Sequence, residues 1–177
     1  MEINARIISK SSVLGVGILI LVLLGTQDKP FNRLLDEVLK LKEKGKINDD
    51  IVAQIGCTKF SSDKIKTLSF VSREEYAKLN DEADIIITHA GVGTITDCIK
   101  KGKKVIVVPR LKEYKEHTND HQIQITKEFE EKGYVLAAYD IKDLGKVVKK
   151  LDKFKPNKYE SNNEKFKEKL KEYIDSI

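Results

Sequence analysis

The stretch Asp84-Ile-Ile-Ile-Thr-His-Ala-Gly-Val-Gly-Thr94 decides the fold class of this 177-residue chain. Three consecutive isoleucines are followed at once by a turn that holds two glycines. An unbroken apolar run of this kind is typical of a parallel strand that is buried on both faces of its sheet. A helix is expected from about Thr94 to Lys101, so the stretch predicts a strand, a tight turn and a helix in succession.

The same alternation continues on both sides of this stretch. Further strands are expected at Ile18–Leu24, Ile51–Ile55, Thr67–Val71, Val105–Val108 and Tyr134–Ala138. Apolar residues at helical spacing follow Pro30, and Ser72 with Glu75 forms a capping box, so helices are expected between the strands. Later helices are expected at His121–Lys132 and from Asp140 to about Leu151. Strands that alternate with helices predict an α/β fold built on a doubly wound parallel sheet.

Three segments are expected along the chain. Residues 1–17 form an N-terminal extension of unassigned role, residues 18–155 form the ligand-binding domain, and residues 156–177 form a lysine-rich linker with a terminal helix. The apolar run within residues 11–27 is shorter than the about 20 residues that a membrane-spanning helix needs. A buried strand is therefore the favoured interpretation of this run, and a membrane anchor is the minor one. No small-residue cleavage site follows it, which disfavours a signal peptide.

Composition and charge narrow the possible partners. The net charge is +5, and the excess lysines lie late in the chain among acidic residues, which is typical of a solvated helical face. Aromatic residues make up only 7% and form no stacking motif, so nucleic acid is not expected as a partner. Cys57 and Cys98 form no metal-binding pattern and fit a reducing compartment. Neither a metal ion nor a cofactor is expected.

The turn from His89 to Thr94 is the strongest candidate for a binding site. Gly91 and Gly93 lack side chains, so a ligand can approach the backbone closely, and the following helix points free N–H groups and its positive dipole end at that ligand. These features favour a diphosphate. Asp97, expected on the first turn of the helix, can accept both hydroxyls of a ribose. GxGxxG and GxxxxGK[ST] are both absent, which disfavours a dinucleotide and a P-loop. A strand-to-helix turn without a ligand is the alternative.

Other candidate residues follow the remaining strands, because ligands of doubly wound sheets bind beyond the carboxyl ends of the strands. The segment Arg110–Gln122 carries groups that can recognise sugar hydroxyls: His117, Asn119, Asp120, His121 and Gln122. A solvated loop with Asn119 as a helix cap is the alternative. Arg110 and Lys112 either add positive charge near a phosphate or are ordinary surface residues.

Four motifs in combination resemble one family. They are Gly25-Thr-Gln-Asp-Lys-Pro-Phe-Asn-Arg-Leu34, Ile87-Thr-His-Ala-Gly-Val-Gly-Thr94, Val107-Val-Pro-Arg110 and Asn119-Asp-His-Gln122. Together they resemble the small subunits of two-part glycosyltransferases in bacterial capsule and exopolysaccharide synthesis (PssE-like). These subunits are similar to the donor-binding subunit of the eukaryotic chitobiosyldiphosphodolichol-forming transferase and to the C-terminal half of the lipid II N-acetylglucosaminyltransferase. The resemblance, which covers residues 18–151, implies a family 28 domain: the Rossmann-like C-terminal half of a GT-B glycosyltransferase.

The resemblance implies a set of residues that bind a UDP-sugar. The set is Gly25, Thr26, Val71, His89, Gly91, Gly93, Thr94, Asp97, His121 and Gln122. Gly25 and Thr26 correspond to a glycine-hydroxyl loop near the diphosphate. Gly91, Gly93 and Thr94 correspond to residues at the helix that faces the diphosphate. Val71 corresponds to a position whose backbone contacts uracil.

Further correspondences concern the ribose and the sugar. Asp97 stands in place of a longer glutamate that holds the ribose. His121 and Gln122 correspond to a Gln-Gln pair, one of which contacts the sugar. Gln54 and Gly56 correspond to a Gln-x-Gly strand end of unassigned role.

The chain is too short to include the acceptor half of a GT-B enzyme. The resemblance therefore implies a membrane-bound partner subunit that supplies the general base, and a location at the cytoplasmic face of the cell membrane. The implied reaction is inverting transfer of a hexose from a UDP-sugar to a lipid-diphosphate-linked saccharide. Galactose is favoured, with N-acetylglucosamine and glucuronic acid open. Two alternatives remain: a non-catalytic scaffold subunit of the same complex, and a basic module that binds nucleic acid or a membrane surface.

Overall fold

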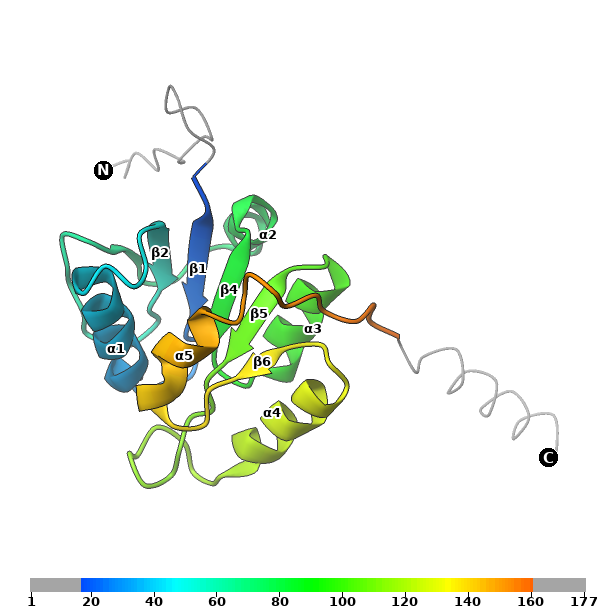
Figure 1. Cartoon of the computed structure of the whole chain (residues 1–177). Helices are drawn as coiled ribbons and strands as arrows, with labels where there is room; N and C mark the ends of the chain where they lie inside the picture. Colours follow the sequence, from blue (N-terminus) through cyan, green and yellow to red (C-terminus); the bar gives the residue numbers. More distant parts are fainter. Residues whose placement is uncertain (1–16, 161–177) are drawn as a thin grey trace, which may run out of the picture.

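The computed structural model describes residues 17–160, which form one parallel sheet with helices on both faces (Figure 1). In chain order the elements are β1 Leu19–Leu23, α1 Asn32–Glu43, β2 Asp50–Gln54, β3 Lys66–Leu68, α2 Arg73–Glu82, β4 Ile85–Thr88, α3 Val92–Lys100, β5 Lys104–Val107, α4 His121–Glu131, β6 Leu136–Ala137, the 3-10 helix η1 Ile141–Asp143, and α5 Leu144–Val148. The expected N-terminal extension up to residue 16 and the expected terminal helix lie outside the described residues. Within residues 17–160 no helix has the length and apolar character needed to cross a membrane.

All six strands are parallel and run in the order β3-β2-β1-β4-β5-β6. This order confirms the predicted doubly wound sheet. The winding direction reverses between β1 and β4, where ligands of such folds bind. The register pairs Leu23 with Gln54 on one side and with Thr88 on the other. The loops that follow β1, β2 and β4 therefore leave the sheet at the same level, at the lower edge in Figure 1.

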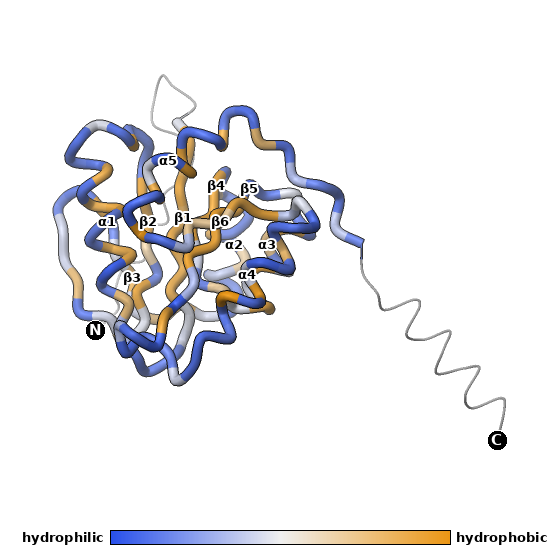
Figure 2. The backbone as a smooth tube through the Cα atoms, turned by 60° about the horizontal axis from the view of Figure 1, so that its bottom comes forward, coloured by the Kyte–Doolittle hydropathy of each residue, from blue (hydrophilic) through white to orange (hydrophobic). Residues whose placement is uncertain are grey.

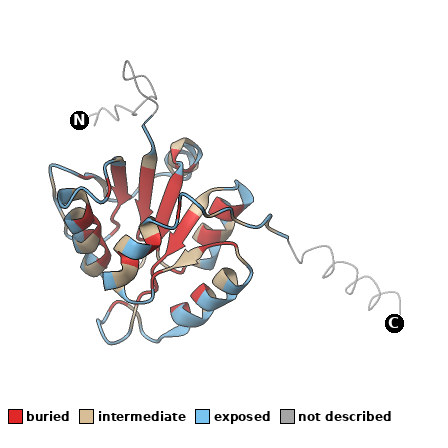
Figure 3. Ribbon diagram, in the orientation of Figure 1, coloured by how far each residue is buried: buried red, intermediate tan, exposed pale blue. Residues whose placement is uncertain are grey.

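Alternate residues of β1 feed two hydrophobic layers, one on each face of the sheet. Ile20 and Val22 pack in the layer beneath α1 and α5, whereas Leu21 and Leu23 pack in the layer beneath α2 and α3. Figure 3 shows the central strands buried over most of their length, and Figure 2 shows hydrophobic stretches along the strands and within the helices that cover them. The strands read as unbroken apolar runs because both faces are covered.

Several element boundaries differ from the sequence-based expectation, most of them by one or two residues. Helix α3 begins at Val92 with Gly91 as its N-cap, so Asp97 lies on the second turn and not on the first. Strand β3 ends at Leu68, and Val71 lies in the loop that leads to α2. The left-handed backbone of Gly56 (φ +55°) turns the chain away after β2, so β3, which pairs with β2 as far as Leu68, has no paired strand beside it further on. The helix expected from Asp140 to about Leu151 is the 3-10 helix η1 followed by the short α5, which ends at Val148.

Candidate functional site

A cleft of about 310 Å³ opens beyond the carboxyl ends of β1 and β2. Four of the predicted site residues line it: Gly25, Thr26, Val71 and Thr94. The other lining residues are Leu23, Gln54, Phe70, Ser72, Arg73 and Tyr76. The loop after β1 and the first turn of α3 therefore face the same space as the first turn of α2.

Gly25 is held in a left-handed conformation at one wall of the cleft, with φ +79°. Its N–H donates to Oε1 of Gln54 at 3.2 Å, and Nε2 of Gln54 donates to its carbonyl at 3.1 Å. A side chain at position 25 would also collide with the His89 ring, since a Cβ would lie 2.6 Å from Cε1. Both the backbone conformation and the available space require glycine here.

His89 packs between the two glycine turns. A Cβ at Gly91 would lie 2.5 Å from its Nε2, so the ring occupies the space beside both Gly25 and Gly91. Its Nδ1 lies 3.4 Å from the carbonyl oxygen of Leu23. Burial, reinforced by the Arg110 cation, lowers the pKa of His89 to about 4. The imidazole is consequently neutral at physiological pH and does not supply a fixed positive charge.

The amino end of α3 is free of any side-chain cap in the described chain. The N–H groups of its first turn, which include those of Gly93 and Thr94, are therefore available to a ligand. A Cβ at Gly93 would meet no atom within 4 Å, so the space over this residue is open. Asp97 is exposed one turn further on, and its charge helps, after burial, to raise the pKa of Tyr76 in the cleft. Asp97 is not among the residues that line the cleft.

The two predicted sugar-binding residues are placed differently from each other. Gln122 is buried, and its Oε1 accepts from the backbone N–H groups of Ala90 (3.2 Å) and Arg110 (2.9 Å). Its amide nitrogen makes no hydrogen bond within residues 17–160, so Gln122 can offer a donor to a ligand. His121 is exposed, and its Nδ1 lies 3.3 Å from Oε1 of Gln124. Neither residue lines the cleft itself.

Asn119 is not the cap of α4. Asp120 occupies the N-cap position without a side-chain capping bond, and Oδ1 of Asn119 accepts from the N–H of His121 at 3.1 Å. Among residues 17–160 the His117 ring bonds only to the backbone of Asn119, with Nδ1 3.1 Å from its carbonyl oxygen and 3.3 Å from its N–H nitrogen. The segment before α4 is thus braced by local hydrogen bonds.

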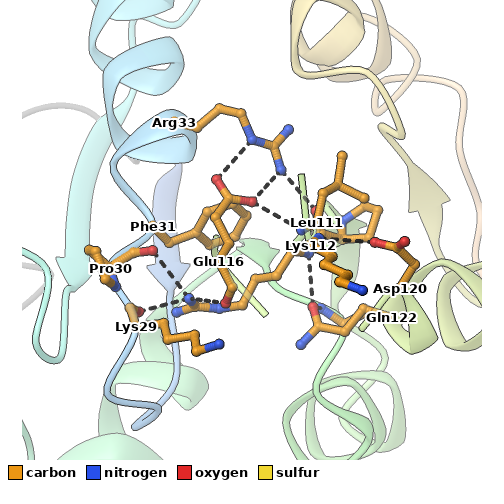
Figure 4. Close-up of polar contacts among 12 residues, drawn as sticks. Lys29, Pro30, Phe31, Arg33, Leu111, Lys112, Glu116, Asp120 and Gln122 are labelled. Carbon is orange, nitrogen blue, oxygen red and sulfur yellow. Dashed lines mark hydrogen bonds and ion pairs between the residues drawn. The ribbon is translucent and has the colours of Figure 1, made fainter. Parts of the chain in front are cut away.

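Arg110 is neither a phosphate ligand at the surface nor a solvated residue, which corrects both sequence-based interpretations. Its side chain is buried, with 1% exposure, and it stacks 4.7 Å from the centre of the Phe31 ring. The guanidinium donates to backbone carbonyls, including those of Leu24 and Lys29, both at 2.8 Å. Figure 4 shows Lys29 and Pro30 on one side of this cluster and Glu116 above it. The guanidinium also donates to the backbone carbonyl of Glu116. Arg110 therefore ties the loop after β1 to the loop after β5.

The Glu116 carboxylate anchors the same loop to helix α1. It accepts two hydrogen bonds from Arg33, at 2.9 and 2.7 Å, and one from the backbone N–H of Leu111 at 3.1 Å (Figure 4). A larger groove of about 550 Å³ lies beside this ion pair on the surface of α1. No predicted site residue lines that groove, and both of the cations that line it, Arg33 and Lys40, are already paired with glutamates.

Sequence reasoning missed Arg73 and Tyr76, which line the cleft from α2. The capping box was the signal that could have found them. Ser72 and Glu75 form it as predicted, with hydrogen bonds of 2.8 and 3.1 Å, so α2 begins immediately after Val71. Residues three apart share a helix face. A helix that starts beside the site therefore presents both side chains to it.

This topology and this cleft define the class of the molecule as an α/β, Rossmann-like domain, and solved glycosyltransferases share its fold. The match to the structure described as the glycotransferase of kitacinnamycin covers 85% of this chain and 38% of that structure, with a TM-score of 0.58 and 16% sequence identity. The match to the glycosyltransferase SnogD from Streptomyces nogalater covers 86% of this chain and 44% of that one, with a TM-score of 0.53 and 16% sequence identity. The match to the NMR solution structure of ALG13 covers 84% of this chain and 92% of that one, with a TM-score of 0.56 and 22% sequence identity.

The chain belongs to the glycosyltransferase family 28 C-terminal domain, whose family model matches residues 19–177. It is 31% identical over 104 residues to the UDP-N-acetylglucosamine transferase subunit ALG13 of Candida albicans, a match that covers 59% of this chain and 34% of the relative. It is 32% identical over 132 residues to the protein of the same name from Candida glabrata, and this match covers 71% of this chain and 61% of the relative. The chain thus spans only part of these relatives. The family expected from the sequence motifs is confirmed.

Proposed function

We propose that this chain binds the UDP-sugar donor of an inverting glycosyltransferase and that a separate chain completes the active site. One observation carries the proposal: the Gly25 loop and the uncapped amino end of α3 line the same cleft at the switch point of the sheet. Free N–H groups at a helix terminus bind phosphate oxygens, and open space over Gly93 lets a diphosphate approach them. Family membership supports the same assignment.

The remaining cleft residues provide for the rest of the nucleotide. Uracil is assigned to the wall formed by Val71, where backbone groups of the loop before α2 can read its edge. Asp97 is assigned to the ribose hydroxyls. During transfer the leaving UDP gains negative charge, and the fixed dipole and N–H groups of α3 stabilise that charge without reorganising.

The sugar is assigned to Gln122 and His121, beyond the diphosphate turn. Because Oε1 of Gln122 already accepts two backbone hydrogen bonds, its contact with a sugar is made by donating to a hydroxyl or carbonyl oxygen. Two donors are candidates. The resemblance to capsule and exopolysaccharide subunits favours UDP-galactose, whereas the names of the two Candida relatives favour UDP-N-acetylglucosamine.

The partner is assigned to the edge of the sheet that carries the cleft. Six large apolar or aromatic side chains are exposed within residues 17–160, and five of them follow the carboxyl end of a strand: Phe70, Val92, Tyr114, Ile123 and Tyr139. All five lie at the edge of the sheet that carries the cleft, and this is the reason for assigning the partner to that edge. A membrane-bound acceptor subunit that covers this edge supplies the general base and the lipid-linked saccharide. It also holds this chain at the cytoplasmic face of the membrane.

Calorimetric titration of the purified chain with UDP, UDP-galactose, UDP-N-acetylglucosamine and UDP-glucuronic acid tests the proposal. Saturable binding that favours one sugar establishes the donor. Asp97→Ala should weaken UDP binding at least about 10-fold, because a hydrogen-bonded carboxylate contributes more than about 1.4 kcal/mol. Asp81→Ala, at the opposite edge, is the control. Full transfer activity of a complex that carries Asp97→Ala would instead favour the non-catalytic scaffold.

A further inference from the structure

Gln54 is the last residue of β2, and its side chain is only 5% exposed. Its amide makes three hydrogen bonds to the backbone. Oε1 accepts from the N–H of Gly25 at 3.2 Å, while Nε2 donates to the carbonyl of Gly25 and to that of Ser69, both at 3.1 Å. The amide therefore joins the loop after β1 to the loop after β3.

The pattern of partners is specific to glutamine. Gly25 presents one donor and one acceptor and Ser69 presents a second acceptor, so the bridging group must accept once and donate twice. A glutamate carboxylate would place negative oxygens against two carbonyl oxygens. A methionine of similar length would leave the N–H and the carbonyl of Gly25 without these partners in a partly buried place, while the Ser69 carbonyl would keep only its bond from the N–H of Gly56.

Two further contacts show how closely the backbone is packed here. A Cβ at Gly56 would lie only 2.7 Å from the carbonyl oxygen of Gly25, so the end of β2 abuts the loop after β1. The His89 ring presses on Gly25 from the other side. Gly25 thus lies in contact with residues that follow β2 on one side and β4 on the other. Gln54 is the side chain that hydrogen-bonds both the N–H and the carbonyl of Gly25.

We propose that Gln54 is a positioning residue for the donor site, which fixes the Gly25–Thr26 loop relative to the Ser69–Val71 loop before the ligand arrives. Residues of both loops line the cleft. A cleft with preset walls does not spend binding energy on ordering them. The inference rests on the proposed function, since it assigns Gln54 to the site that takes the UDP-sugar.

The variant Gln54→Glu tests this role through pH. When protonated, the new carboxyl can donate to a carbonyl and accept from Gly25, whereas the ionised form cannot donate. Burial beside carbonyl oxygens raises the pKa of such a carboxyl. We expect UDP affinity at least about 10-fold below wild type near pH 8, with most of the loss recovered near pH 5. Asn48→Asp, the same change at the exposed segment before β2, should follow wild type at both pH values.

The charged and titratable groups that face Gln54 from neighbouring elements are His89 beyond β4 and Arg73 and Tyr76 on α2. Burial keeps the pKa of His89 near 4 and raises that of Tyr76, so neither changes charge between these two pH values. Normalising to wild type at each pH removes any remaining contribution.

Hydrogen exchange at the Gly25 amide, followed by NMR, tests the inference without a ligand. We expect protection in wild type, loss of protection in Gln54→Glu near pH 8, recovery near pH 5, and loss at both pH values in Gln54→Met. If wild type binds no UDP, the proposed function fails and the exchange measurement still decides the role of Gln54. Two results overturn the role: unchanged Gly25 protection in Gln54→Met, or a folded Gln54→Glu that shows no recovery at low pH.

Discussion

At the scale of single residues, the site depends on how side chains fill the space beside three glycines. The His89 ring lies against Gly25 and Gly91, whereas nothing lies over Gly93. Gly25 and Gly91 are thus required by the protein itself, and Gly93 leaves room for something else. The sequence shows three similar glycines, and only the structure separates their roles.

Gly91→Ala should destabilise the fold by about 1–3 kcal/mol, because the new methyl group meets His89 and the ring cannot retreat past Gly25. Gly93→Ala is the matched control. It should leave the free energy of unfolding unchanged or raise it by up to about 1 kcal/mol, since alanine favours a helix, while UDP binding falls. Chemical denaturation and UDP titration of both variants measure this. A stable Gly91→Ala protein would contradict the packing described here.

The neutral state of His89 predicts a pH dependence of stability. Its folded pKa of about 4 is below the ordinary value of about 6.5, so the unfolded chain binds the proton more readily between these values. Stability should therefore fall as pH drops from about 6.5 to about 4, by up to about 3 kcal/mol. His89→Gln should show a shallower fall in urea denaturation. His121→Gln, at an exposed histidine, should retain the wild-type slope, and an identical slope in both variants would refute the prediction.

Arg110→Met should lower the free energy of unfolding by at least about 3 kcal/mol, because the carbonyls of Leu24 and Lys29 lose charged donors inside the protein. Lys112→Met, two residues away and exposed, should change it by no more than about 0.5 kcal/mol. Urea denaturation measures both. Equal stabilities of the two variants would show that Arg110 is not a structural residue.

At the scale of elements, the order and type of strands and helices could be predicted from apolar runs, because a strand buried on both faces has a distinctive sequence. The capping box at Ser72 also placed the start of α2 correctly. The end of β3 could not be predicted, because it depends on Gly56 turning the chain away after β2, the strand with which β3 pairs. The start of α3 was set two residues late because glycines at 91 and 93 resemble a turn, yet Gly93 is helical.

The capping box gives a prediction at the same scale. Ser72→Ala removes the hydroxyl that accepts from the N–H of Glu75, which should cost about 1 kcal/mol of stability. It should also weaken UDP binding, because the first turn of α2 carries Arg73 and Tyr76 into the cleft. Ser61→Ala, at an exposed position, is the control for both measurements. Wild-type stability in Ser72→Ala would mean that the cap does not hold α2.

At the scale of the whole molecule, the sheet brings together residues that are far apart in the sequence. That the loops after β1 and β4 share an edge could be predicted from the doubly wound pattern alone. The roles of Gln54 and Arg110 could not, because each bonds to backbone atoms of segments distant in sequence. Such contacts leave no local pattern. They exist only once the strands have been placed in order.

The central claim is that UDP occupies the cleft beyond β1 and β2. NMR titration of the isotope-labelled chain with UDP tests it most directly. The claim predicts saturable shifts of the backbone amides of Gly25, Val71, Gly93 and Thr94, with the amides at the opposite edge of the sheet unchanged. Saturable shifts confined to the groove on α1, or no shifts at UDP concentrations that saturate related donor sites, would contradict it.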